Sequence, residues 1–346
     1  SPIQKGTRFT MMKQRIAALL LAGLMLLSLS ACGGGGDSSA GGSSGDKDGA
    51  YKMSVILKTT ASEHWQLIMA GCRKFESEHP DVVIDITGPA NETSYDDQQN
   101  MIETTLNNSE VDAIIIAPLQ SETAATLIAG ETRPVFALDT NIDAPEIVSF
   151  IGTGNEAAAK LGATEAVKAA KAAGWETIEC IEIAGVKGDA TNTARMNGYT
   201  AGVNENGGTF LADEIQYANA VADQAVTCME AIIQTHPDGI AIVCANNDDM
   251  AVGAVRAAEG NPSFANTIFL GFDGSTGACQ AILDGLLTMS VAQQPYEMGY
   301  LACQTAYDKL QGKDVDAVVD PGIEVISPEN AQARIDKVNG YLAGQN

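Results

Sequence analysis

The chain is poor in aromatic, basic and histidine residues, and each shortage argues against a class of function. Aromatic residues make up 5% of the sequence, so a sugar site built on stacked rings has few rings to use. Lysine and arginine total 20 against 44 acids, and the formal net charge of −24 argues against nucleic acid and anionic lipid surfaces as partners. The three histidines are scattered, which argues against a zinc site.

The sequence also lacks a cysteine framework, because its seven cysteines include no CxxC pair and no regular spacing. Six of them fall in expected helices or strands, and we expect these six to be buried small hydrophobic residues. Disulfides would be compatible with export, but pairing cannot be deduced from spacing. The six are Cys72, Cys180, Cys228, Cys244, Cys279 and Cys303.

The seventh cysteine ends a segment with the pattern of a lipoprotein export signal. Lys13 and Arg15 precede an apolar run of about fourteen residues, which is shorter than the roughly 20 needed to span a bilayer. The run ends in the lipobox LSAC, where small residues directly precede Cys32. We therefore interpret residues 11–31 as a cleaved signal peptide and Cys32 as the lipid-anchored first residue of the mature protein.

The residues on either side of this signal are expected to lie outside the folded domain. Residues 1–10 precede a pair of methionines and are interpreted as mis-assigned upstream translation. Residues 32–50 are nearly all glycine, serine, alanine and aspartate, a composition that cannot bury a core and predicts a flexible linker. The mature protein is thus expected outside the cytoplasm, anchored to the cell membrane by lipid; a Gram-positive surface and a periplasm both remain open.

From Tyr51 onward, short apolar runs alternate with longer segments of helical periodicity. This alternation predicts right-handed βαβ units and parallel sheets. Roughly 300 residues are available, which is comfortable for two lobes. We therefore predict an α/β fold of two doubly wound parallel-sheet lobes. The expected strands are Met53–Leu57, Val82–Ile86, Ala113–Ile116, Val135–Leu138, Val148–Ile151, Ile178–Ile183, Ile240–Cys244, Ile268–Phe272 and Thr288–Ala292.

Polar residues follow many of these strands directly. Asp139, Asp273 and Gln293 each come after an apolar run, and two asparagines and two aspartates follow another at 246–249. In doubly wound sheets, ligands bind outside the carboxyl ends of the strands, so we expect these side chains to share one rim. Carboxylates accept hydroxyl protons and amides both donate and accept, which is the chemistry of a site for a polyhydroxylated ligand.

Three stretches carry a resemblance to a known family. They are NDDMAVGA at 247–254, GFDG at 271–274 and AQQPYEMG at 292–299. With these stretches in this order and spacing, the chain resembles the ribose/galactose-type substrate-binding proteins of ABC importers over roughly residues 52–330. Any one stretch alone would not be specific.

The resemblance implies the type I periplasmic binding protein architecture, a Venus-flytrap of two lobes joined by a three-strand hinge. The N-terminal lobe would comprise residues 51–153 plus 294–322. The C-terminal lobe would comprise residues 154–293 plus 323–346. The implied partners are a small sugar, an ABC permease with its ATPase, and the membrane through the lipid at Cys32. No cofactor, metal or nucleic acid is implied, and a monomer is expected.

The resemblance also implies ligand contacts. Asp139 would accept sugar hydroxyls from the N-terminal lobe, and Asn247, Asp273 and Gln293 would contact the ligand from the C-terminal lobe and the hinge. Aromatic side chains at the start of the first helix would sandwich the sugar ring. The candidate ligand-binding residues are Lys58, Ser62, His64, Trp65, Asp139, Thr140, Thr193, Asn247, Asp273 and Gln293.

Four positions depart from the ribose-binding pattern. Thr140 and Thr193 stand where ribose binders place arginines, and Ala220 aligns where an aromatic residue is expected. Lys58 replaces a small hydroxyl residue. Since threonine cannot reproduce the bidentate geometry of a guanidinium, the fold prediction holds but ribose is not implied as the ligand.

Each candidate also has an interpretation without a ligand. The strand-end aspartates could be turn residues, Asn247 could cap a helix, and Trp65 could belong to the core. Lys58 could meet the ligand or pair with an acid. Arg195 is expected to brace neighbouring backbone or carboxylates.

Three other functional classes compete with a transport-binding protein. The segment GTGNEA at 152–157 matches a loose dinucleotide-binding pattern, but it coincides with an expected lobe crossing. Asp139 and Asp273 could mimic the acid–base pair of a glycoside hydrolase, but no G-x-S-x-G elbow or catalytic triad accompanies them. A sensor module binding a signal such as autoinducer-2 for a chemoreceptor or kinase remains the alternative to a non-enzymatic lipoprotein that captures a monosaccharide or related polyol.

Overall fold

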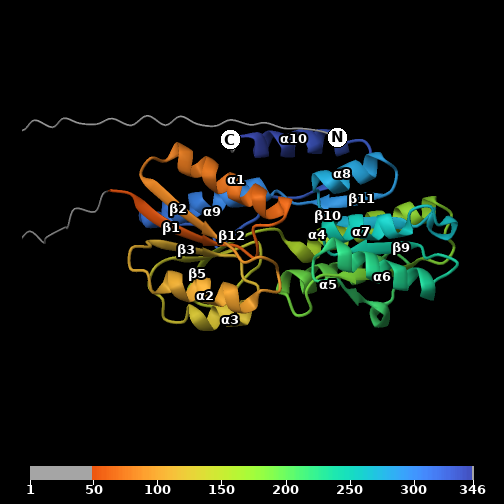
Figure 1. Ribbon diagram of the computed structural model, residues 1–346, viewed down its shortest axis with the longest axis horizontal. Coiled ribbons are helices and arrows are strands. Elements are labelled where there is room, and N and C mark those ends of the chain that lie inside the picture. The colour runs from red at the N-terminus through yellow and green to blue at the C-terminus, as the bar shows by residue number, and fades with distance from the viewer. Residues whose placement is uncertain (1–48, 345–346) are drawn as a thin grey trace, which may run out of the picture. The chain divides into compact units, whose positions relative to one another are not determined.

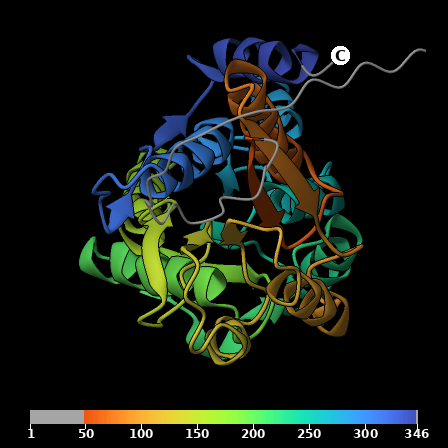
Figure 2. The ribbon, with the colours of Figure 1, turned by 90° about the vertical axis from the view of Figure 1, so that its left-hand side faces the viewer.

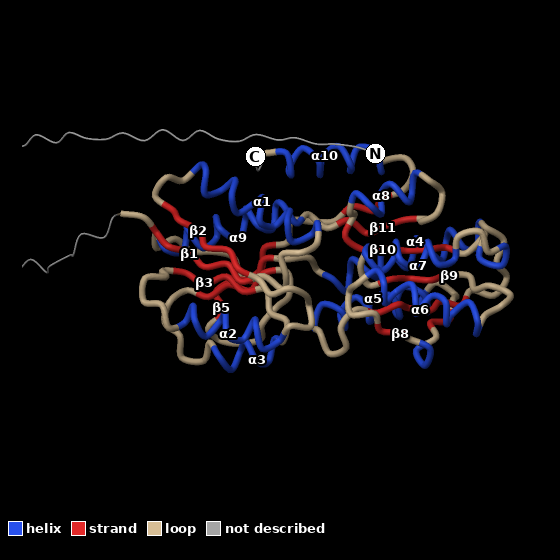
Figure 3. The backbone as a smooth tube through the Cα atoms, viewed as in Figure 1, coloured by secondary structure: helices blue, strands red, loops and turns tan. Residues whose placement is uncertain are grey.

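A computed structural model describes residues 49–344, and the fold and site are given for these residues. They form two α/β lobes, each with a central sheet between layers of helices (Figures 1 and 3). Within this range no helix is both long and apolar enough to cross a bilayer. The expected export signal, Cys32 and nearly all of the linker lie outside the described residues.

The sheet of the N-terminal lobe has six strands, all parallel, in the order β12-β5-β4-β3-β1-β2. Its central strands are buried on both faces, which explains their continuous apolar sequence. The strands are β1 (Tyr51–Ile56), β2 (Val82–Thr87), β3 (Ala113–Ile116), β4 (Val135–Leu138), β5 (Ile147–Ile151) and β12 (Val318–Val319).

Helices cover both faces of this sheet. On one face lie α1 (Glu63–Glu78) and α9 (Pro295–Leu310), and on the other lie α2 (Tyr95–Leu106) and α3 (Ser121–Leu127) (Figure 2). The pair α1 and α9 approach closely at Gly299, where an added Cβ would lie 2.0 Å from the carbonyl oxygen of Ile68. A glycine is therefore required here by packing, although α9 is distant from α1 in sequence.

The sheet of the C-terminal lobe has the order β13-β11-β10-β9-β6-β7, with β8 also paired to β6. All its pairings are parallel except that of β13 with β11, which is antiparallel. The strands are β6 (Glu179–Ala184), β7 (Thr209–Phe210), β8 (Gln216–Tyr217), β9 (Ile242–Ala245), β10 (Ile268–Asp273), β11 (Met289–Ala292) and β13 (Glu324–Ile326).

This sheet is also covered on both faces. Alanine-rich α4 packs with α5 on one face, and α6, α7 and α8 pack on the other, with α10 beside α8. The bounds are α4 (Asn155–Ala172), α5 (Ala190–Glu205), α6 (Ala222–Thr235), α7 (Asp248–Ala258), α8 (Thr276–Leu283) and α10 (Ala331–Ala343), with 3-10 turns at Ala212–Glu214 and Pro262–Phe264.

The chain passes between the sheets three times: after β5, after β11, and between β12 and β13. Arg334 of α10 donates to the backbone carbonyls of Asp273, Gly274 and Gln293, which ties the second crossing to the C-terminal lobe. The prediction of two doubly wound lobes is confirmed. The prediction of parallel sheets was wrong for β13. This short strand follows the third crossing and pairs antiparallel to β11.

The six cysteines in the described residues are free and buried, as the apolar surroundings predicted. Cys180 and Cys244 lie on neighbouring strands with their sulfur atoms 3.5 Å apart. They pack as small hydrophobic residues between the sheet and α4.

Candidate functional site

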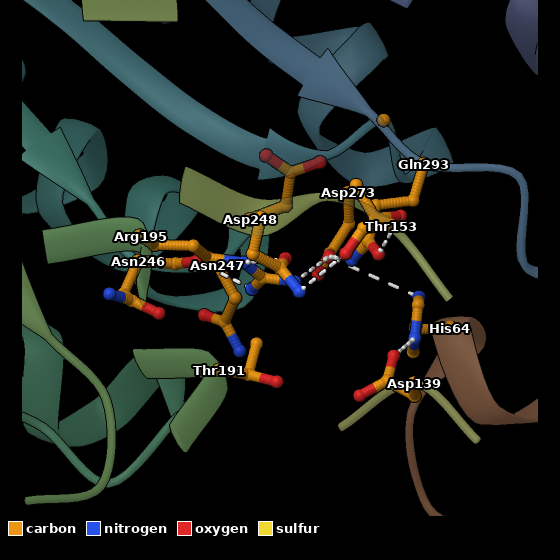
Figure 4. A network of polar contacts seen from close by, with 12 residues as sticks. His64, Asp139, Thr153, Thr191, Arg195, Asn246, Asn247, Asp248, Asp273 and Gln293 are labelled. Carbon is orange, nitrogen blue, oxygen red and sulfur yellow. Dashed lines mark hydrogen bonds and ion pairs between the residues drawn. The ribbon is translucent and has the colours of Figure 1, made fainter. Parts of the chain in front are cut away.

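The carboxyl ends of both sheets face one cleft, which is lined by residues of both lobes. The cleft encloses about 750 Å³ including its open mouth. Carboxylates, amides and a few cations dominate the lining, and Figure 4 shows how they converge from opposite sides.

On the N-terminal side, His64 and Asp139 form the central pair. His64 lies in the first turn of α1, and its Nε2 is 2.8 Å from Asp139 Oδ2. Asp139 directly follows β4 in a left-handed conformation (φ 63°), which aspartate tolerates better than most residues. Burial alone would raise the pKa of Asp139, but the His64 hydrogen bond and nearby positive charges lower it to about 2. Asp139 is therefore a fixed negative charge in the cleft.

Lys58 and Asp189 join the two lobes by a buried ion pair. Lys58 Nζ lies 2.5 Å from Asp189 Oδ2, and the two side chains are only 4% and 9% exposed. Asp189 also caps α5 by accepting from the backbone N–H of Asn192. Burial lowers the pKa of Lys58, but the charges of Asp189, Glu92 and Asp139 outweigh it and raise the pKa overall. Lys58 is thus paired with an acid, one of the two interpretations that its sequence left open.

Trp65 forms part of the N-terminal wall of the cleft. It is nearly fully buried in the core between α1 and the sheet, yet it also lines the cleft. Its Nε1 donates to Glu92 Oε1 at 3.1 Å. Burial raises the pKa of Glu92, and the positive charge of Lys58 opposes this shift.

On the C-terminal side, Arg195 organises the wall. Its guanidinium donates to Asn155 Oδ1 and to the carbonyl of Asn246, and it stacks 3.9 Å from the ring centre of Phe272. One guanidinium nitrogen also lies 3.9 Å from Asp273 Oδ1. Arg195 therefore braces backbone and carboxylate, as its sequence context predicted, while presenting positive charge to the cleft.

Asp273 and Gln293 connect the C-terminal wall to the lobe crossings. Gln293 donates to Asp273 Oδ1 at 2.7 Å and accepts from Thr153 Oγ1 at 2.8 Å, so one side chain links the first and second crossings (Figure 4). Asp273 has φ 130°, a conformation that L-residues rarely adopt. Such strain is often found at functional sites.

Asn247 and the next two residues form the start of α7 at the cleft. Asn247 caps the helix by accepting from the N–H of Met250. Burial and the charge of Asp273 raise the pKa of Asp248 to about 7, although it accepts hydrogen bonds from Ser275 and Ser290. Partial burial and the same charge raise the pKa of Asp249 to about 6.

Glu63 of α1 also reaches across the cleft. Its carboxylate accepts from both the backbone N–H and the hydroxyl of Thr276, at the first residue of α8. A carboxylate from one lobe thus occupies the helix N-terminus of the other, where negative charge is favourable. This contact can form only when the lobes are closed, so the structure represents a closed state.

Eight of the ten candidate ligand-binding residues line the cleft: Lys58, Ser62, His64, Trp65, Asp139, Asn247, Asp273 and Gln293. Thr140 and Thr193 do not line it. The Thr140 hydroxyl is buried against Thr191, 2.5 Å away, and Thr193 is exposed and bonds to the backbone of Asp189. Several other lining residues were not among the predicted ligand contacts, although Asn246 was expected at this rim: Glu63, Glu92, Asp189, Thr191, Asn192 and Asn246.

Glu182 of β6 lies fully buried behind the C-terminal wall. It accepts from Asn246, while its second carboxylate oxygen has no partner among the described residues. Burial raises its pKa to about 8, against smaller opposite effects of Asn246 and Arg195. At neutral pH this side chain therefore carries a proton.

We expect Glu182 to make folding stability pH-dependent. Because its folded-state pKa lies above its ordinary value, its favourable contribution is complete below about pH 4.5 and is lost as the pH rises toward about 8. Glu182→Gln should remove this dependence and stabilise the protein at pH 8 by on the order of 3 kcal/mol relative to wild type. Urea unfolding from pH 5 to 8 measures the free energy of unfolding of both proteins. Glu179→Gln, at the start of the same strand, is the control. Parallel pH profiles for wild type and Glu182→Gln would contradict it.

No group of three or more histidine, cysteine, aspartate or glutamate side chains within residues 49–344 is arranged to hold a metal ion. The cleft carboxylates are instead engaged by His64, Lys58, Gln293 and backbone N–H groups. The arrangement can accept hydrogen bonds from a ligand at several fixed points.

Comparisons with known proteins agree with this two-lobed α/β fold. A family model described as a periplasmic binding protein domain matches residues 53–314. The ribose import binding protein of Bacillus subtilis is 31% identical over 228 residues, covering 62% of this chain and 68% of that protein. The D-allose-binding periplasmic protein of Escherichia coli is 28% identical, covering 72% and 81%.

Solved structures show the same fold. A carbohydrate transporter solute-binding protein from Agrobacterium radiobacter, in complex with D-arabinose, aligns with a TM-score of 0.76 at 25% identity, covering 84% of this chain and 98% of that chain. An ABC transporter solute-binding protein from Agrobacterium vitis with bound D-fucose aligns with a TM-score of 0.73 at 25% identity, covering 81% and 96%.

Proposed function

Since the chain belongs to the periplasmic binding protein family, and within it to the ribose/galactose type, we propose that it captures a monosaccharide or related polyol outside the cytoplasm and delivers it to an ABC import permease. Its relatives are sugar-binding transport proteins and not enzymes. The role of this chain is accordingly to bind and release its ligand unchanged.

The observation that carries the proposal is the polar cleft between the carboxyl ends of two sheets. Asp139 on one side and Asp273, Asn247 and Gln293 on the other provide fixed acceptors and amides. A ring with several hydroxyls can donate to the carboxylates of both lobes at once, whereas a flat apolar ligand would leave them unpaired.

Transport follows from opening and closing of the lobes. The open form would bind sugar on the N-terminal wall, and closure would bring Asn247, Asp273 and Gln293 onto its other side. A ligand favours closure only through the contacts that it gains in the closed state. The closed form would dock on the permease, and release would follow when the permease separates the lobes.

The lipid anchor belongs to the same proposal. Cys32 would hold the protein to the outer face of the cell membrane through its diacylglyceryl group, and residues 32–50 would act as a linker. Mass spectrometry of the protein extracted from membranes tests this. An acylated N-terminal Cys32 is expected, and a non-acylated protein recovered from the cytoplasm would contradict it.

A thermal-shift screen tests the ligand class. Pentoses, hexoses, inositols, nucleosides and autoinducer-2 should be compared, and a rise in Tm is expected with a monosaccharide or polyol because ligand binds only the folded form. A shift with autoinducer-2 alone would instead support the sensor function. The sensor function would also be supported by two results together. Sugar uptake would survive deletion of the permease, and a sugar-induced response would be lost when this protein is deleted.

A further inference from the structure

His64 has an unusual position between the two lobes. It belongs to α1 of the N-terminal lobe, its side chain is 10% exposed, and its Nε2 contacts Asp139 of the same lobe. Its Nδ1 is buried and has no hydrogen-bond partner among the described residues. Across the cleft, Asp273 Oδ1 of the C-terminal lobe lies 3.9 Å from this nitrogen (Figure 4).

Two atoms at this separation can share one hydroxyl group once the side chains around the buried Nδ1 make room for it. A distance of 3.9 Å is too long for a direct hydrogen bond, but an oxygen about 2.8 Å from each atom can lie between them. That oxygen would accept from Nδ1–H and donate its own proton to Asp273. A hydroxyl can do both, whereas an ether or carbonyl oxygen cannot donate.

This arrangement requires His64 to carry a second proton. Asp139 is ionised and can only accept, so Nε2 must donate to it. In the neutral ring, Nδ1 would then present a lone pair to the Asp273 carboxylate and to the ligand oxygen. In the protonated ring, Nδ1–H can donate to the ligand hydroxyl. The nitrogen that has no hydrogen-bond partner among the described residues then gains one.

The charges around His64 favour the proton. Asp139 follows β4, Asp273 ends β10 and Asp249 lies on α7, and all three attract it. Arg195 of α5 opposes it, as does burial, but the net effect is a pKa above the ordinary value of histidine. The negative contribution of Asp273 exists only when the lobes are closed.

We propose that His64 and Asp273, one from each lobe, hold a single hydroxyl group of the bound ligand between them, and that His64 takes up a proton from solvent as the lobes close. This inference rests on the proposed sugar-binding function. It adds that affinity is linked to pH through one side chain, and that a sugar lacking the hydroxyl at this point is rejected.

Proton linkage tests the inference directly. The full-length protein is titrated with D-ribose, D-allose, D-arabinose and D-fucose by calorimetry at several pH values across the neutral range, each in two buffers of different ionisation enthalpy. Uptake of up to one proton is expected, at its greatest between the free-state and bound-state pKa of His64, with each sugar that binds. Affinity should be constant at low pH and fall by up to tenfold per pH unit between these two pKa values. Binding with no proton uptake at any of these pH values would overturn the inference and leave the proposed function intact.

Variants identify the side chain that takes up the proton. His64→Gln should abolish the uptake and flatten the pH profile, and Asp273→Asn should reduce the uptake. Asp248, Asp249 and Glu182 titrate in a similar pH range, so the assignment depends on the difference between wild type and His64→Gln. The matched control is His236→Gln, since His236 also pairs with a carboxylate but lies outside the cleft. Unchanged uptake in His64→Gln would overturn the inference.

A comparison of the free and sugar-bound protein completes the test. Imidazole NMR should show that the pKa of His64 is higher in the sugar-bound protein than in the unliganded protein, because Asp273 approaches His64 only in the closed form. Equal pKa values in the two forms would overturn the inference whichever sugar binds. Failure of every sugar to bind would contradict the proposed function, and the ligand contact inferred here with it.

Discussion

Asp139→Asn is expected to weaken sugar binding by about a hundredfold or more while leaving the fold intact. Asparagine keeps the shape of aspartate and tolerates the left-handed backbone at this position. The substitution removes the negative charge that accepts ligand hydroxyls and the hydrogen bond of His64. Each hydrogen bond to a charged group contributes about 1.5–3 kcal/mol to binding or stability. Since His64 also loses its charged partner, two contacts weaken together.

Calorimetry with the sugar that gives the largest thermal shift measures this loss. The matched control is Asp143→Asn, an exposed aspartate in the same loop after β4, which should bind as wild type does. Cooperative melting of Asp139→Asn would show that folding is preserved. Wild-type affinity in Asp139→Asn would show that the ligand lies elsewhere.

Asp189→Asn is expected to shift the protein strongly toward the open form. The side chain of asparagine can still cap α5, but Lys58 loses its ionised partner in the closed state. Leaving one member of a buried ion pair uncompensated costs about 3–5 kcal/mol. Opening returns Lys58 to water and avoids this cost, so the closed population rather than the fold should decrease, by about a hundredfold or more.

Small-angle X-ray scattering measures this shift as a larger radius of gyration at equal sugar concentration. Glu205→Gln is the matched control, because its pair with Lys160 is exposed and lies within one lobe. The double variant Lys58→Met, Asp189→Leu should recover part of the closed population, since neither charge remains buried. A closed Asp189→Asn protein would show that the ion pair does not hold the lobes together.

The fold could be predicted because its strands are buried on both faces. Val135–Leu138 and Ala113–Ile116 were predicted with the bounds that the structure gives, since an apolar run that ends at a polar residue marks both ends of such a strand. The strands that sequence analysis missed, β7, β8, β12 and β13, have two or three residues each. Their positions depend on pairing with distant strands, which no local pattern records.

The sequence could predict those cleft-lining residues that directly follow a strand. Asp139 and Asp273 follow their strands directly, and both line the cleft. Thr193 does not line the cleft, and helical geometry explains why. Thr191 and Arg195 are four residues apart in α5 and share the face toward the cleft, whereas Thr193 lies between them on the opposite face.

Glu92 illustrates what the sequence could not show. It lies in the loop between β2 and α2, far from any motif, and reaches the cleft through its contact with Trp65. Likewise, the pairing of Lys58 with Asp189 joins residues of different lobes. Such contacts depend on how the lobes meet and not on local spacing.

Calorimetric titration of the wild-type protein with the monosaccharides and polyols of the screen tests the central claim most directly. We expect saturable binding of one sugar molecule per chain, with the sugar recovered chemically unchanged and the affinity reduced in Asp139→Asn. If no neutral sugar or polyol binds, or if the bound sugar is converted to a product, the cleft does not have the function proposed for it.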